Sequence, residues 1–339
     1  MSSQPNGVTS ATSQPYKQTF RLGRIVRGYG TQLGILGVFF TLWIIFIVSA
    51  PDTFLSPRIY YAFMSTVPFF GMMAIPLTMV VIAGEMDLSF PSIMAMGMVA
   101  FILTYEATTS VALSFIIALI TGVFIGWVNG IIIVKFGIPS LVATIGTQFF
   151  WRGAVLVLSQ GKSGSLTFMR ESLLRPVLVG KISNEFPVQM LWFILIVIIG
   201  WVLLNRHRFG AHTYLIGDNV KSAELMGINT GRTRIKLFML IGLVSAFAGV
   251  VASLHVAFFW PSLGEGYLLR TLASVFLGGT SVFGGTGTIL GTFIGAFIIG
   301  AIEAATVAVG LTGFWTQLIY GLIIVLSVIM HTYLRKRME

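Results

Sequence analysis

Ionisable and amide side chains inside long apolar runs are the residues of this chain that could do chemistry. In a hydrocarbon layer such groups are costly, so they usually face a protein interior or a water-filled pathway. The alternative for each of them is a hydrogen bond between helices, or a side chain that reaches the membrane surface from the end of a span. Together with one aromatic neighbour, the candidates for a transport pathway are Asp87, Asn129, Gln148, Trp151, Arg152, Glu303 and Gln317.

These polar residues form no catalytic pattern. The four histidines form no HExxH or similar metal motif, and the chain has no cysteine for thiolate chemistry, disulfides or metal binding. Gly161-Lys162-Ser163 resembles the end of a P-loop, but Leu156 stands where the first glycine must be. Gly285-Thr286-Gly287 lacks the spacing of a dinucleotide loop. We therefore predict that this chain has no catalytic residues, no metal and no cofactor of its own.

A polar stretch at residues 205–236 interrupts the apolar chain. Within it we predict a short helix from Asp218 to Met226, with Asp218 or Asn219 as N-cap and Gly227 in the left-handed position that ends the helix. Such a helix is too short to span a bilayer and too polar to enter one, so it should lie at the membrane surface and meet a partner. An ordinary solvated connector is the alternative.

The elements that must position these residues are membrane helices. Hydrophobic residues make up 56% of the chain and charged residues 9%, against roughly a quarter charged in soluble domains. The formal charge of +10 comes from short clusters beside apolar spans, where cations orient a protein and meet anionic lipid, so we expect no nucleic-acid partner. We predict an all-α polytopic protein with about ten spans, at 31–50, 62–83, 91–107, 111–134, 138–159, 188–204, 237–258, 267–284, 288–309 and 314–332.

The distribution of cations predicts both termini in the cytoplasm. Residues 1–30 form a polar tail that we expect to be disordered. Residues 31–334 form the transmembrane domain, with 205–236 as its cytoplasmic loop, and 335–339 form a basic C-terminus. Ser49-Ala50-Pro51 resembles a signal-peptide cleavage site, but the preceding apolar run suits a spanning helix better. The segment 160–187 falls outside in this arrangement although it carries cations.

Glycines at intervals of four predict close helix packing, because they lie along one face and let backbones approach. Two such sets occur in predicted spans: Gly122, Gly126 and Gly130, and Gly287, Gly291 and Gly295.

Several segments resemble the permease subunits of ribose-type ABC sugar importers, the branch that also carries xylose, galactose and autoinducer-2 systems. The family's "GRxxxAxGxNxxAAxxxGI" element is similar to residues 209–228, and its "GxIDLSVGS" element to residues 84–91, where Phe90-Pro91 replaces Val-Gly. The "PxFIATLG…RG" element resembles residues 138–153, and "LGGTSxxGGxG" resembles residues 277–287. The elements follow one another in the family's order.

The resemblance implies a fold like that of the vitamin B12 importer class and a bacterial inner-membrane location. It implies three partners: a cytoplasmic ABC ATPase that binds ATP and Mg²⁺, an extracytoplasmic sugar-binding protein, and a second permease copy or paralogue. The short helix would then press into the ATPase, and Val220-Lys221-Ser222, where the family has a small apolar-acidic run, favours a cognate one. The residues expected to couple to the ATPase are Asp218, Asn219, Ala223, Glu224, Met226 and Gly227.

A different class of transporter is also compatible with an apolar chain of this kind. An ion-coupled secondary transporter would use carboxylates within the membrane, such as Asp87 and Glu303, as proton or sodium sites. That alternative does not explain the helix at 218–227.

Overall fold

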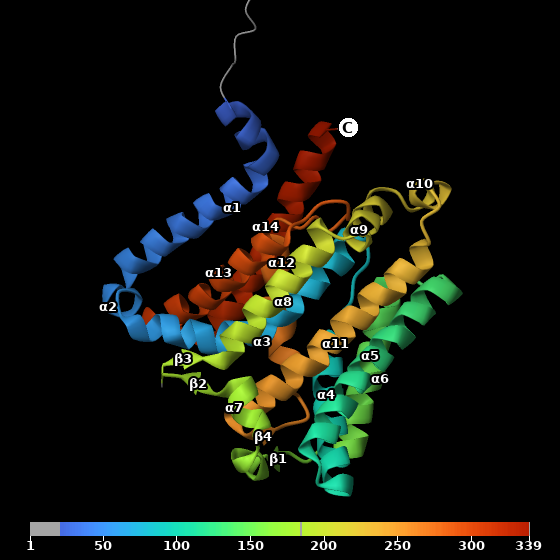
Figure 1. The fold of residues 1–339 in the computed structure, drawn as a ribbon. Helices are drawn as coiled ribbons and strands as arrows, with labels where there is room; N and C mark the ends of the chain where they lie inside the picture. The colour runs from blue at the N-terminus through green and yellow to red at the C-terminus, as the bar shows by residue number, and fades with distance from the viewer. Residues whose placement is uncertain (1–20, 184, 339) are drawn as a thin grey trace, which may run out of the picture.

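The computed structural model describes residues 21–183 and 185–338, and it is almost entirely helical (Figure 1). Two small antiparallel sheets, each of two strands, pair β1 (Gly164–Ser165) with β4 (Phe258–Phe259) and β2 (Lys181–Ile182) with β3 (Phe186–Pro187). Gly164 lies opposite Phe259 in the first sheet, and Lys181 lies opposite Pro187 in the second. The α-helices are α1 Arg21–Ser49, α2 Pro51–Phe54, α3 Pro57–Ile82, α4 Phe90–Thr108, α5 Val111–Phe136, α6 Ser140–Ser159, α7 Leu174–Val179, α8 Val188–Asn205, α9 Arg208–Asp218, α10 Val220–Leu225, α11 Thr230–Val256, α12 Leu268–Leu277, α13 Ile289–Ala308 and α14 Gly313–Met338. Two 3₁₀ turns are η1 Thr167–Glu171 and η2 Glu265–Tyr267.

Eight helices among the described residues are long and apolar enough to cross a membrane, which confirms a polytopic all-α protein. They are α3, α4, α5, α6, α8, α11, α13 and α14. The apolar part of α1, Gly34–Ser49, is shorter.

Two predicted boundaries differ from the structure. The span expected at 267–284 is replaced by α12, whose ten residues end at Leu277. Ten helical residues rise about 15 Å, half the hydrocarbon thickness, and the backbone turns at Gly279 and Gly284, which have positive φ angles. In addition, α1 begins at Arg21, so the chain is already helical within the expected tail; residues 1–20 lie outside the described part.

Helix α3 lies at the centre of the bundle, and 89% of the residues in its apolar stretch are buried. It packs on α11 on one side and on α8, α12 and α13 on the other, while α4, α5 and α6 extend the first group and α1 and α14 extend the second (Figure 1). The shared central helix makes one bundle of the two groups.

Glycines permit the closest of these contacts. A Cβ added at Gly122 or Gly126 would overlap backbone atoms of α11, and one at Gly130 would lie 2.8 Å from Ile235 Cα. On α13, a Cβ at Gly291 or Gly295 would overlap carbonyl oxygens of Gly278 and Ser274. Gly287 lies in the turn before α13 rather than on it, because φ at this residue is 159° and the helix starts only at Ile289.

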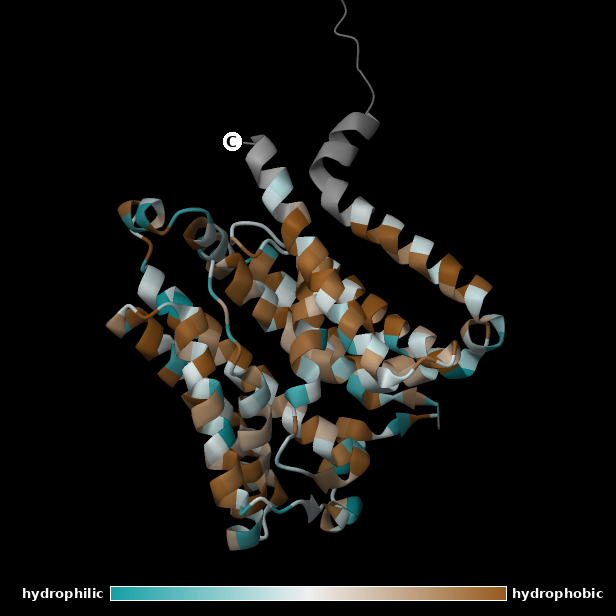
Figure 2. Ribbon diagram, turned by 180° about the vertical axis from the view of Figure 1, so that it is seen from behind, coloured by the Kyte–Doolittle hydropathy of each residue, from teal (hydrophilic) through white to brown (hydrophobic). Residues whose placement is uncertain are grey.

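Polar segments gather at two opposite ends of the bundle. One end holds α9, α10, the turn between α5 and α6 and the C-terminal end of α14; the other holds α7 and both small sheets (Figure 1). Figure 2 shows apolar ribbon along the helices between these ends and hydrophilic residues at the ends themselves. This separation is the one expected if residues 205–236 and 160–187 lie on opposite sides of a membrane.

Candidate functional site

The short helix predicted in the polar stretch is present as α10, Val220–Leu225. Asn219 is its N-cap, and its side-chain oxygen accepts a hydrogen bond of 2.9 Å from the Ser222 N–H. At the other end Gly227 has φ of 81°, and its N–H donates to the Glu224 carbonyl at 2.9 Å. An Asn cap and a glycine in the left-handed region are the local signals that start and stop a helix.

The exposed face of α10 is apolar at its tip. Leu225 is 83% exposed and Met226 is 58% exposed, although both belong to a polar segment. Exposed large apolar side chains are typical of a docking surface, and a solvated connector does not require them. Leu225 was not among the predicted coupling residues, and its place two residues before the terminating Gly227 is the signal that could have indicated it.

The remaining predicted coupling residues hold α10 in place. Ala223 is fully buried within the chain, so its side chain does not face a partner as we expected. Glu224 accepts a hydrogen bond of 2.8 Å from the Thr230 hydroxyl at the start of α11. Asp218 ends α9 and is exposed.

Helix α9 connects α10 to the interior of the bundle. The Tyr214 hydroxyl donates to the Gly287 carbonyl at 2.8 Å, and the Gly285 N–H donates to the Ile82 carbonyl at 2.9 Å. A Cβ added at Gly217 would overlap the Ile82 carbonyl and lie 2.6 Å from the Gly285 nitrogen. Three chain segments can meet this closely only because glycine leaves room for their backbones.

We call this meeting point the glycine junction and define it by Gly84, Gly217 and Gly284. A Cβ added at Gly284 would lie 2.9 Å from the Gly217 carbonyl oxygen and 3.0 Å from Gly84 Cα. Gly84 and Gly284 also have φ angles of 78° and 82°, which a side chain would strain. The junction therefore brings together the end of α3, the end of α9 and the turn before α13.

Beyond the junction the chain between α3 and α4 is not helical. The backbone of residues 83–89 is held by α6: the Ser140 hydroxyl accepts from the Met86 N–H at 2.9 Å, and the Thr144 hydroxyl accepts from the Leu88 N–H at 3.1 Å. Irregular backbone at membrane depth is stable only where protein groups satisfy it. Ser140 and Thr144, one turn apart on α6, do so here.

A buried polar cluster follows in the same segment. Asp87 is fully buried, and its Oδ1 accepts hydrogen bonds of 2.7 Å from both the N–H and the hydroxyl of Ser89. The Asn129 amide of α5 donates to the same hydroxyl at 2.7 Å. Asp87 Oδ2 and Asn129 Oδ1 have no hydrogen-bond partner within the described residues. The structure thus brings together two of the predicted pathway residues, through a serine that we had not singled out.

An ion pair connects this segment to α11. Arg234 lies one turn into α11 and pairs with Glu85, whose side chain is 8% exposed. Because α10 leads directly into α11 through residues 226–229, the pair places a charge contact between the polar end of the bundle and the interrupted segment.

The other predicted pathway residues do not join this cluster. On α6, the backbone carbonyl of Gln148 accepts a hydrogen bond from the Ser92 hydroxyl at 2.9 Å, and the Trp151 ring nitrogen is buried without a partner in the described part of the chain. Arg152 donates to the carbonyls of Pro261, Pro91 and Leu263 and pairs with Glu265 at 3.4 Å, so it clamps loops together.

The last two candidates lie on the far side of α3. Glu303 of α13 pairs with Arg270 of α12 at 2.7 Å, and Gln317 of α14 is exposed. Since α13 and α14 pack on α12 and not on α6, the seven predicted residues form no single site. Pairing of Glu303 with a cation also leaves it less suited to bind a proton or sodium ion.

Comparison with known proteins gives a consistent set of relatives. Residues 59–328 match the family described as "Branched-chain amino acid transport system / permease component". The autoinducer 2 import system permease protein LsrC of Yersinia pestis (strain Pestoides F) is 34% identical over 254 residues, which cover 75% of this chain and 71% of that protein. The protein of the same name from Yersinia enterocolitica (serotype O:8) is 35% identical over 254 residues, covering 75% and 69%. No solved structure matches the chain. These relatives confirm the resemblance that the motifs indicated.

Proposed function

We propose that this chain is the membrane-embedded subunit of an ATP-driven ABC importer. The chain belongs to the family of branched-chain amino acid transport system permease components. Its solute would be a monosaccharide or a similar small polyol-like molecule, by analogy with the autoinducer 2 permeases that it resembles. The fold would be that of the vitamin B12 importer class.

One observation carries the proposal: the glycine junction joins α10 to the interrupted segment between α3 and α4. Gly217 lies on the helix that precedes α10, while Gly84 opens the interrupted segment. A displacement of α10 would reach the buried chain through packed backbones at the junction and through the pair formed by Arg234 and Glu85.

In this mechanism the permease is a gate with two access states. ATP binding to a partner subunit shifts the balance between the states, because a ligand shifts an equilibrium only when it prefers one state. Leu225 and Met226 would dock in a groove of the ATPase. Asp87, Asn129, Gln148 and Trp151 would offer weak contacts to a polar solute, and Arg152 would keep the neighbouring loops in place.

The partners follow from the same proposal. An ATPase with bound ATP and Mg²⁺ lies in the cytoplasm beside α10, and a sugar-binding protein delivers the solute at the end that carries α7 and the small sheets. A second permease copy or a paralogue completes the channel in the bacterial inner membrane. Both chain termini lie in the cytoplasm.

Reconstitution into liposomes tests the function. The permease, its cognate ATPase and the binding protein should take up labelled solute with ATP, and an ATPase variant that cannot hydrolyse ATP should abolish uptake. Uptake should persist when the proton gradient is collapsed while ATP is maintained. Uptake by the permease alone, driven by a proton or sodium gradient, would refute the assignment in favour of a secondary transporter.

A further inference from the structure

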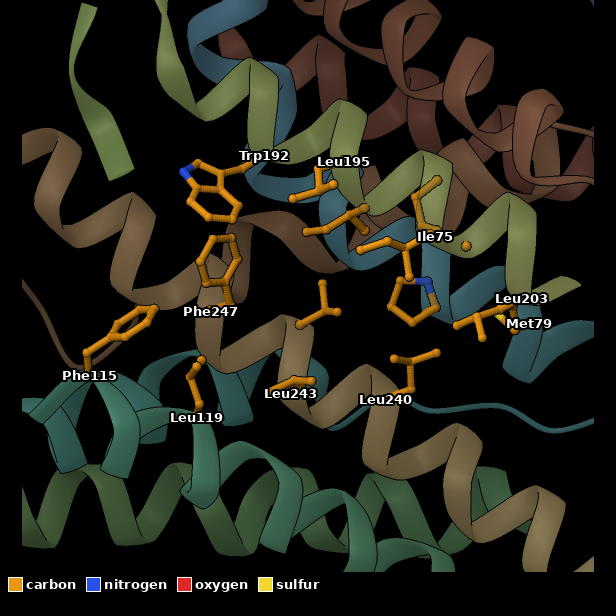
Figure 3. Close-up of a pocket in the computed structure, with 15 residues that line it drawn as sticks. Ile75, Met79, Phe115, Leu119, Trp192, Leu195, Leu203, Leu240, Leu243 and Phe247 are labelled. Carbon is orange, nitrogen blue, oxygen red and sulfur yellow. The ribbon is translucent and has the colours of Figure 1, made fainter. Parts of the chain in front are cut away.

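A wholly apolar groove runs between α8 and α11 at membrane depth (Figure 3). Its volume is about 330 Å³, and its floor is formed by Ile75, Pro76 and Met79 of α3. Helices α8 and α11 both pack on α3 but make little contact with each other, which is why the groove exists. Leu195 and Ile199 on its α8 wall are 42% and 47% exposed, so the groove opens sideways toward the membrane.

The two ends of the groove differ. At one end, near the sheets, three aromatic rings meet. The ring centroid of Phe247 lies 5.3 Å from that of Trp192 and 6.2 Å from that of Phe115. The Trp192 ring nitrogen donates to the Val177 carbonyl of α7 at 2.9 Å, which fixes this aromatic wall. At the other end Figure 3 shows Leu203, Met79 and Leu240 and no comparable aromatic wall.

The length of the groove matches one leaflet. Its lining residues on α8 extend from Trp192 to Leu203, a rise of about 16 Å at 1.5 Å per residue. The hydrocarbon layer is about 30 Å thick, so each leaflet contributes about half of that. The groove is therefore about as long as one acyl chain, and it runs from the second turn of α8 near the sheets to the last turn of α8 at Leu203.

Three cations lie close in the chain to the lining residues at the Leu203 end of the groove. Arg206 and Arg208 follow Leu203 at the end of α8, and Lys236 lies one helical turn before Leu240; all three are exposed. Within the described residues none of the three forms an ion pair with a carboxylate, and Arg206 lies over the Trp201 ring at 5.4 Å. Arginine and tryptophan together at the end of a span are typical of the headgroup level.

We propose that this groove is a binding site for one acyl chain of an anionic phospholipid, whose phosphate contacts Arg206, Arg208 and Lys236. The apolar lining excludes a sugar or any other polar solute, because a polar group there would lose its hydrogen bonds. The positive charge at the Leu203 end favours an anionic headgroup over a zwitterionic one, because each Lys or Arg near the surface contributes about 1 kcal/mol to the attraction of anionic lipid. The bound chain holds α8 and α11 together where they do not touch.

Native mass spectrometry of the purified chain in a mild detergent tests the site. With equal amounts of phosphatidylglycerol and phosphatidylethanolamine added, the wild type should retain one phospholipid, at least about fivefold enriched in phosphatidylglycerol. Leu119→Trp fills the groove from α5 and should lower retention at least about fivefold. Ile120→Trp is the matched control, because its side chain is 55% exposed on the same helix and does not line the groove.

A second pair of variants tests the headgroup. Arg206→Gln with Lys236→Gln should remove the preference for phosphatidylglycerol while a phospholipid is still retained. If Leu119→Trp lowers the folded yield, Leu243→Phe fills the groove with a smaller change from α11. These readings need no transport, so they are independent of the proposed function.

Three outcomes would overturn the proposal: a wild type without bound phospholipid, equal retention in Leu119→Trp and Ile120→Trp, or no preference between the two lipids. A single cysteine at Ile199, in a chain without native cysteine, gives a further check. Disulfide cross-linking between two copies through this position, without bound lipid, would assign the groove to an interface between permeases instead.

Discussion

Leu225 and Met226 are exposed apolar side chains, and we expect them to contact the partner ATPase. We predict that Leu225→Asp lowers ATPase association at least about tenfold, because burying a leucine at an interface contributes about 1.5–3 kcal/mol and a carboxylate there would lose its hydration. The measurement is a pull-down with the cognate ATPase, beside the yield of detergent-stable permease. Leu173→Asp, at an 87% exposed leucine at the opposite end of the bundle, is the matched control. Equal association of both variants would mean that α10 is only a connector.

Glu85 and Arg234 are a second test at the scale of single residues. We predict that Glu85→Gln destabilises the permease by about 3 kcal/mol, because it leaves the guanidinium of Arg234 unpaired in a largely buried place. Adding Arg234→Gln should recover part of the loss, with a coupling free energy of about 1–3 kcal/mol in a double-mutant cycle. Thermal unfolding in detergent measures the stability. Strictly additive effects of the two changes would show that the pair does not connect α11 to the interrupted segment.

Among the elements, α5 and α11 make the closest helix pair. We predict that Gly126→Ala lowers the melting temperature of the solubilised permease by several degrees, because the added methyl group would overlap the Phe238 carbonyl and backbone overlap costs about 1–3 kcal/mol. Gly146→Ala on α6 is the control, since nothing lies within 4 Å of its added Cβ. That variant should be neutral or slightly stabilising through its better helix propensity. If both variants unfold alike, close packing is not the reason for the glycine on α5.

The interrupted segment shows how an element can be defined by its neighbours. Residues 83–89 leave the helical path, and the N–H groups of Met86 and Leu88 donate to the hydroxyls of Ser140 and Thr144 on α6. Because α6 supplies the acceptors for these two N–H groups, the path of the loop depends on α6 remaining against it. A displacement of α6 would expose the backbone beside Asp87, and this is where we expect the two access states to differ.

For the whole molecule, the absence of cysteine allows a direct test of orientation. We predict that a single cysteine at Ser163 reacts with an impermeant maleimide in intact cells. One at Ser222 should react only after the membrane is permeabilised. Both serines are exposed and lie at opposite ends of the bundle, so the side of the membrane on which each lies decides whether the maleimide reaches it. Labelling of Ser222 from outside would reverse the orientation and place α10 away from any cytoplasmic ATPase.

The sequence by itself determined the class of protein and the local form of the short helix. Mean apolarity and span length are additive properties, so a window along the chain could find most of the spans. The limits of α10 depend on Asn219 and Gly227, whose preferences act within a few residues. The end of α12 at Leu277 could not be found in this way, because hydropathy does not register where glycines with positive φ stop a helix.

Only the tertiary structure decided which residues act together. Asp87 and Asn129 are 42 positions apart and meet through Ser89, while Arg152 and Glu303, equally polar in sequence, are held in separate contacts. Ala223 is buried although we expected it to face a partner, and Leu225 is exposed although leucines are usually buried. The glycine junction joins motifs that are far apart along the chain. Contacts of this kind depend on which helix faces pack together, and a single sequence carries no direct record of that choice.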